Sequence, residues 1–206
     1  METQVLIRKA LVATYCLGLV MGLASCGGDT GFVAAGSPEA PVELTLHGVF
    51  IDSAVEGVRV ESGRLTSTTD NRGAFLYRSR SSVKFYIGDI LLGETEGASL
   101  ITPIELVDGA SSVNHPTVTN IARFLQTLDD DASPDNGIKI TPTVFNLGKG
   151  KVVNFDQSID DFTDDGDVQV LVASMTAATT AGARTLVDAD TAQAHLRASL
   201  IATLEK

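Results

Sequence analysis

The sequence predicts an α+β protein in which an N-terminal antiparallel β-sandwich carries the helices of the C-terminal half packed on it. Three observations support this prediction. Apolar and polar residues alternate in short segments up to residue 108, which is the period of half-buried strands. Turn-forming Gly, Asp and Asn residues separate these segments. After residue 109 the apolar spacing changes to three and four, which is typical of amphipathic helices.

Residues 44–108 form the predicted β-sandwich domain, with alternation beginning just before it. The expected strands are 42–46, 49–51, 58–60, 65–69, 74–77, 83–87, 90–92 and 100–106. The segment 70–73, Asp-Asn-Arg-Gly, predicts a hairpin turn, because Asp and Asn bond locally and Gly accepts a positive φ. Gly93 is expected to end its strand. The residues of the first strand expected to face the core are Val42, Leu44 and Leu46.

Residues 109–206 form the predicted helical region, and none of its helices has an apolar face broad enough to stand alone. The expected helices are 116–128, 168–175 and a last one that begins at Asp188 or Asp190. Asn120 and Arg123 lie away from the apolar face of the first helix, so we expect them to be exposed. The residues of the last helix expected to face the core are Ala192, Leu196, Leu200 and Leu204.

Residues 1–25 predict a signal peptide. Arg8 and Lys9 end a short positive head, and the apolar stretch 10–23 that follows is too short for a comfortable membrane span. The stretch ends at Leu23-Ala24-Ser25-Cys26. This ending resembles the lipobox of bacterial lipoproteins, in which a Leu stands three residues before the Cys and small residues fill the gap.

The lipobox resemblance implies that Cys26 is lipidated and becomes the first mature residue, held in the membrane by acyl chains such as palmitate. Gly27 follows it where Asp would retain the protein, and resemblance to enterobacterial sorting then implies the outer membrane, on its periplasmic or surface face. Residues 26–43, rich in Gly, Ala, Ser and Pro, predict a flexible tether. The alternative is an ordinary cleaved signal in which Cys26 is incidental.

Three segments of the strand region share a pattern with known modules. They read Gly-Val-Phe-Ile-Asp at 48–52, Val-Glu-Gly-Val-Arg-Val at 55–60 and Thr-Asp-Asn-Arg-Gly-Ala-Phe at 69–75. The pattern resembles the carboxypeptidase-regulatory or transthyretin-like sandwich and the related Cna-B-type modules. The chain is also similar to uncharacterised bacterial surface lipoproteins, through the stretch 85–93 and the helix at 120–129. These resemblances imply fold and location, and they imply no activity.

One acidic loop is a candidate cation site. It offers oxygens at alternate positions, as a calcium loop does: Asp129, Asp131, Ser133 and Asp135. The loop departs from the calcium pattern at Pro134, where Gly is usual, and at Ile140, where a Glu would close the site. The alternative is a solvated loop. A second acidic cluster, within 160–167, is expected to cap helices.

Composition and motifs exclude several functions. The net charge is −11, so the chain repels nucleic acid. Cys16 leaves with the signal peptide, so no internal disulfide remains. No Gly-rich phosphate loop and no Gly-x-Ser-x-Gly motif occurs, and His47, His115 and His195 show no metal-binding spacing. No cofactor is implied beyond calcium.

The sequence therefore predicts a non-enzymatic, lipid-anchored envelope module that binds a protein or glycan partner, or serves in adhesion or envelope structure. The alternative is a calcium- or ligand-binding accessory protein of the envelope. A third hypothesis is a hydrolytic enzyme whose residues are dispersed along the chain.

Overall fold

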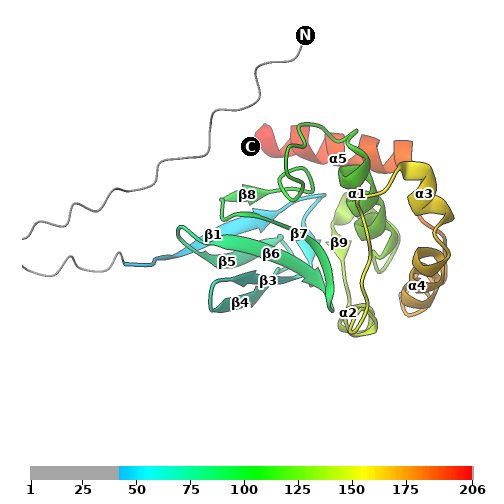
Figure 1. Ribbon diagram of the computed structural model, residues 1–206, viewed down its shortest axis with the longest axis horizontal. Helices are drawn as coiled ribbons and strands as arrows, with labels where there is room; N and C mark the ends of the chain where they lie inside the picture. Colours follow the sequence, from blue (N-terminus) through cyan, green and yellow to red (C-terminus); the bar gives the residue numbers. More distant parts are fainter. Residues whose placement is uncertain (1–41, 206) are drawn as a thin grey trace, which may run out of the picture. The chain divides into compact units, whose positions relative to one another are not determined.

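The computed structural model describes residues 42–205, so the predicted signal peptide, Cys26 and nearly all of the tether lie outside the described residues. Strands dominate the first half of this part and helices the second, which confirms an α+β protein with mainly antiparallel sheets. Figure 1 shows the strands gathered on one side and most helices on the other, with the C-terminal helix (red) lying along the top of both.

The strands form three sheets. They are β1 (Thr45–Phe50), β2 (Val55–Glu56), β3 (Arg59–Ser62), β4 (Leu65–Thr68), β5 (Ala74–Arg78), β6 (Ser82–Ile87), β7 (Ile90–Glu96), β8 (Leu100–Ile101) and β9 (Ile138–Lys139). The sheet orders are β5-β1-β8, β4-β3-β6-β7 and β2-β9. The β1–β8 and β2–β9 pairs are parallel, and the others are antiparallel.

The helices follow the strands in the chain. They are α1 (Pro116–Thr127), the 3₁₀ turn η1 (Pro134–Asn136), α2 (Pro142–Leu147), α3 (Ile159–Asp164), α4 (Gly166–Thr176) and α5 (Ala189–Leu204). Acidic caps begin the last two as predicted: the carboxylate of Asp165 accepts from the amides of α4, and that of Asp188 from those of α5. No helix within residues 42–205 combines the length and apolarity needed to cross a membrane.

The larger of two apolar clusters joins the strand and helix halves. Phe50 on β1 and Phe75 on β5 both lie against Phe85 on β6, with ring centroids 4.6 and 5.2 Å apart, so the two larger sheets share one core. Leu125 and Leu128 at the end of α1 belong to the same buried cluster. The strand half is therefore completed by α1 rather than folded apart from it.

The turn at 70–73 forms as predicted, but it does not close a hairpin. The Asp70 carboxylate accepts from the amides of Arg72 and Ala74 at 2.8 and 2.9 Å. The strands on either side, β4 and β5, belong to different sheets. Ser67 Oγ bonds to both the carbonyl and the amide of Leu76, in place of a ladder of backbone bonds. The predicted hairpin is therefore wrong.

Several predictions of burial and strand length are also wrong. Val42, Leu44 and Leu46 are 73%, 57% and 36% exposed, because period two identifies a face but burial also needs a covering layer. Gly93 does not end β7, which runs on to Glu96. A Cβ at Gly93 would lie 2.5 Å from a backbone oxygen, so glycine here permits close packing. The predicted strand 100–106 shortens to β8, since the Thr102 amide turns to the Glu105 carboxylate at 2.7 Å.

The predicted exposure of Asn120 and Arg123 is wrong as well: both are buried, at 0% and 3% exposure. The Arg123 guanidinium donates to the Val187 carbonyl at 2.7 Å, and the Asn120 amide donates to two carbonyls of the segment before α3. Helix α1 packs against α3, α4 and α5, and its apolar residues share a buried cluster with the strands, so its polar face is interior. Leu204 is 82% exposed, contrary to prediction, because it lies in the final turn of α5.

Candidate functional site

The candidate site begins at a tight turn between β1 and β2. Ile51 and Ala54 form an isolated bridge, which places Asp52 and Ser53 at the tip of the turn. Ser53 has φ +57°, in the left-handed region that non-glycine residues rarely adopt. This turn directs the two side chains apart: Asp52 is fully buried, whereas Ser53 is half-buried beside a pocket.

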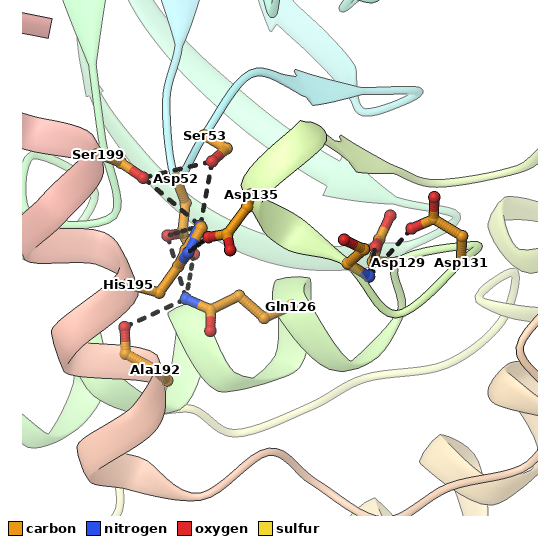
Figure 2. Close-up of polar contacts among 10 residues, drawn as sticks. Asp52, Ser53, Gln126, Asp129, Asp131, Asp135, Ala192, His195 and Ser199 are labelled. Carbon is orange, nitrogen blue, oxygen red and sulfur yellow. Dashed lines mark hydrogen bonds and ion pairs between the residues drawn. The ribbon is translucent and has the colours of Figure 1, made fainter. Parts of the chain in front are cut away.

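Helix α5 brings an imidazole and a second hydroxyl to this turn (Figure 2). Ser53 Oγ lies 3.1 Å from His195 Nε2. Ser199 lies one helical turn beyond His195, so both project from one face of α5. Its Oγ is 3.3 Å from Ser53 Oγ and 3.4 Å from His195 Nε2.

The other imidazole nitrogen contacts the acidic loop. Asp135 Oδ1 in η1 lies 3.1 Å from His195 Nδ1. The tautomer that satisfies both ring nitrogens has Nδ1–H donating to Asp135, while Nε2 accepts from the Ser53 hydroxyl. The side chain of His195 is 9% exposed and that of Asp135 is 93% exposed, so a nearly buried imidazole meets a solvated carboxylate.

Asp52 lies behind the imidazole with no access to water. Both carboxylate oxygens accept from Gln126 Nε2 of α1, at 3.1 and 3.0 Å, and that nitrogen also reaches the Ala192 carbonyl at 3.2 Å. Burial raises the pKa of Asp52 to about 7, and the bond from Gln126 opposes the rise. Its Oδ1 lies 3.9 Å from His195 Nε2.

These groups meet at the edge of an open pocket of about 570 Å³. Its walls come from the 51–54 turn, residues 71–72 after β4, residues 135–137 and the face of α5 between His195 and Thr203. The parallel β2–β9 pair holds the acidic loop beside the turn, and the Ile138 amide donates to the Ala54 carbonyl at 2.9 Å. The pocket is therefore assembled from four segments far apart in the sequence.

The four oxygens of the predicted calcium site are divided rather than gathered. Asp129 and Asp131 lie together, whereas Asp135 turns to His195 (Figure 2). Ser133 takes part through its amide, which donates to both Asp129 and Asp131 at 2.8 and 3.0 Å. Within residues 42–205, no group of three or more His, Cys, Asp or Glu residues is arranged to hold a metal ion.

Protein donors already occupy the carboxylates at the start of the loop. Asp129 is 1% exposed and also accepts from the Lys139 amide at 2.8 Å. Burial raises the pKa of Asp129, and the adjacent Asp131 carboxylate raises it further, while the amides of Lys139 and Ser133 oppose the rise. Arg184 donates to the backbone carbonyls of Asp129 and Thr127, which fixes the end of α1. This part of the loop is held by internal bonds.

Sequence reasoning missed the cluster around His195. No short motif joins Ser53, Asp135 and His195, because the chain separates them by more than 140 residues in all. The available signal was the four-residue spacing of His195 and Ser199 on one helical face. His47 lies on β1 and His115 precedes α1, and neither lines the pocket.

The comparisons with known proteins add no family. The chain matches no protein-family model, and neither a curated protein nor a solved structure is significantly similar to it.

Proposed function

We propose that the protein is a lipid-anchored lipoprotein of the bacterial outer membrane whose folded part is a ligand-binding module. The anchor is supported by the Leu23-Ala24-Ser25-Cys26 segment and the apolar stretch before it. The acidic composition suits a solvated extracytoplasmic surface. The ligand is a protein segment or a glycan of the cell envelope.

The observation that carries the binding function is the open pocket beside α5. It combines apolar walls from Ala54 and Ala198 with the Ser53 hydroxyl and the His195 imidazole, which lie 3.1 Å apart. A concave site with a few placed polar groups is the usual form of a binding site. We favour an organic ligand in this pocket over calcium in the acidic loop. The Asp129 oxygens of that loop are already engaged by backbone amides.

The proposal extends to the fold. We infer that the sheets β5-β1-β8 and β4-β3-β6-β7 are the two layers of a transthyretin-like or Cna-B-type sandwich. The contacts of Phe50 and Phe75 with Phe85 support this inference, since they pack residues of the first sheet against a residue of the second. An experimental structure in which these layers did not face one another would remove it.

The anchor is tested by replacing its cysteine. Cys26→Ala is expected to abolish incorporation of an alkyne-labelled palmitate and to release the protein from washed membranes, because the acylated thiol is lost. Cys16→Ala is the matched control and should leave both readouts unchanged, since that residue lies within the predicted signal peptide. Membrane retention of Cys26→Ala would contradict the anchor.

The binding pocket is tested by filling it. Ala198→Trp places a large ring among the pocket walls and is expected to abolish cross-linking to the partner in native envelope fractions. Val170→Trp, 71% exposed on α4, adds the same ring away from the pocket and should leave cross-linking unchanged. Equal capture by both variants would exclude the pocket as the binding site.

A further inference from the structure

We propose that Ser53 is a nucleophile that hydrolyses small carboxylic esters in this pocket, with His195 as its general base and Asp135 as the residue that positions the imidazole. The proposal rests on the ligand-binding pocket described above and adds a reaction to it. No contiguous motif marks this site, and its absence led to the prediction of a non-enzymatic module; the three residues are dispersed in the chain, and the fold brings them together.

The contacts follow the order that acyl transfer needs. A serine hydroxyl is a weak nucleophile until a base takes its proton, and His195 Nε2 lies 3.1 Å from Ser53 Oγ. The base needs its other nitrogen protonated and held, and Asp135 Oδ1 lies 3.1 Å from Nδ1. The hydroxyl, the imidazole and the carboxylate are therefore linked by two consecutive contacts, from the pocket to its rim.

The backbone at Ser53 adds an independent observation. A φ of +57° is unfavourable for serine, and glycine or asparagine would adopt it more easily. Residues held in sparsely populated conformations occur often at functional sites. In this conformation the Ser53 side chain points from the tip of the turn towards His195 and Ser199 of α5 (Figure 2).

The surroundings supply charge stabilisation for the reaction. As His195 takes the proton it becomes a cation, and the buried Asp52 carboxylate, 3.9 Å from Nε2, stabilises that charge when ionised. In this proposal the side-chain amide of Asn71, which lines the same pocket, donates to the negative oxygen that develops on the substrate. Both groups act on charges that appear during the reaction.

The reaction proceeds in two balanced halves. Ser53 Oγ bonds to the ester carbonyl carbon while its proton passes to His195 Nε2, and the tetrahedral intermediate then expels the alkoxide, which takes that proton and leaves as the alcohol. In the second half a water loses a proton to Nε2 and attacks the acyl-serine. The intermediate breaks the bond to Oγ, Ser53 regains its proton, and the carboxylic acid is released.

The pocket walls define the substrate class. Beside Ser53 the walls include Ala54, Ala198 and Ala202, whose small side chains leave room for a short acyl group. The pocket is open to solvent, so the alcohol part of the ester has no strict size limit. We therefore assign short-chain carboxylic esters, with acetyl esters as the simplest case.

Ser199 is the alternative candidate for the nucleophile. Its Oγ lies 3.4 Å from His195 Nε2, farther than that of Ser53, and it also reaches Ser53 Oγ at 3.3 Å. This geometry makes Ser199 a bonding partner that orients the Ser53 hydroxyl. The two serines therefore provide a matched pair for mutation.

The experiment uses a fluorophosphonate probe and p-nitrophenyl acetate with the purified full chain. We expect one probe molecule per chain, mapped to Ser53 by mass spectrometry, and saturable ester hydrolysis. Ser53→Gly should abolish labelling and lower kcat at least about 100-fold while it relieves the unfavourable φ, so the fold is kept. Ser199→Ala should still be labelled at Ser53.

The base and the positioning residue have separate signatures. His195→Gln should lower kcat about 100-fold or more, because the base is removed. Asp135→Asn should lower kcat about tenfold with KM unchanged, since Asp135 holds the imidazole and does not touch the ester. Asp131→Asn, a change of the same kind in the same loop, should leave both constants unchanged.

Two results would overturn the proposal. Absence of labelling and turnover in a folded protein that still cross-links to its envelope partner would remove the reaction and leave the binding function intact. Labelling at Ser199, or hydrolysis that survives in Ser53→Gly, would reject Ser53 as the nucleophile.

Discussion

The two ends of the acidic loop differ in what their carboxylates contact. At its start, Asp129 is buried, and its oxygens accept from the amides of Ser133 and Lys139. At its far end, Asp135 is exposed and reaches across to His195 on α5. Residues that look alike in the sequence therefore act differently: the first stabilises the loop, and the second contacts the candidate site.

The difference follows from the positions of the neighbouring elements. Asp129 follows α1, where β9 returns beside it and the Lys139 amide donates to its carboxylate. Asp135 lies in η1, which the β2–β9 pair holds next to the 51–54 turn and hence next to α5. Because the neighbouring elements differ, the two carboxylates contact different partners. Mutations at the start of the loop should therefore change stability, and mutations at its far end should change the proposed hydrolysis.

The largest expected effect is the loss of stability in Asp129→Ala. The change removes a buried carboxylate, which leaves the Lys139 amide without its acceptor and the Ser133 amide with Asp131 alone, and this should lower the free energy of unfolding by roughly 3 kcal/mol. Urea unfolding followed by circular dichroism measures it. Asp131→Ala, at an exposed carboxylate of the same loop, should change the value by less than about 1 kcal/mol. Equal losses of unfolding free energy in Asp129→Ala and Asp131→Ala would show that burial does not distinguish the two carboxylates.

The second prediction concerns Asp52, the buried carboxylate behind His195. Its pKa is raised from 3.8 to about 7, so the folded state holds the proton more tightly than the unfolded state. The stability that comes from the protonated form is complete below pH 3.8 and is lost as the pH rises through about 7. Asp52→Asn removes this dependence, so its stability relative to the wild type should grow by roughly 2.5 kcal/mol from pH 5 to pH 8.

Thermal and urea unfolding across that pH range measure the gain. Asp70→Asn is the control, because backbone bonds from Ala74 and Arg72 lower the pKa of Asp70 and it stays ionised throughout the range. A parallel pH profile for wild type and Asp52→Asn would mean that Asp52 is not buried as a neutral acid. His195, the titratable neighbour at 3.9 Å, is checked with the double variant Asp52→Asn/His195→Gln.

The smallest expected effect is that of calcium. Because backbone and side-chain donors already engage Asp129 and Asp131, addition of millimolar calcium should shift the midpoint of thermal unfolding by less than about 1 °C. Magnesium at the same concentration is the control for ionic strength. A rise in the midpoint of thermal unfolding that is specific to calcium and disappears in Asp131→Asn would show that the loop is a cation site. The two ends of the loop would then not differ in function as described above.

Local sequence was sufficient for many of the elements. The alternation of Val83, Phe85 and Ile87 predicted β6, and the carboxylates of Asp165 and Asp188 predicted the starts of α4 and α5, because strand period and helix capping are decided within a few residues. The short elements α2, α3, β2 and β9 were missed, since too few residues carry their pattern.

The sequence by itself determined an acidic α+β chain with a strand half, a helical half and one acidic loop. The tertiary structure alone decided which polar residues are buried, as at Asn120 and Arg123, because burial depends on what covers a face. It also decided that Ser53, Asp135 and His195 meet. Such a meeting requires a parallel strand pair and a packed helix between residues far apart in the chain, and no local period encodes those contacts.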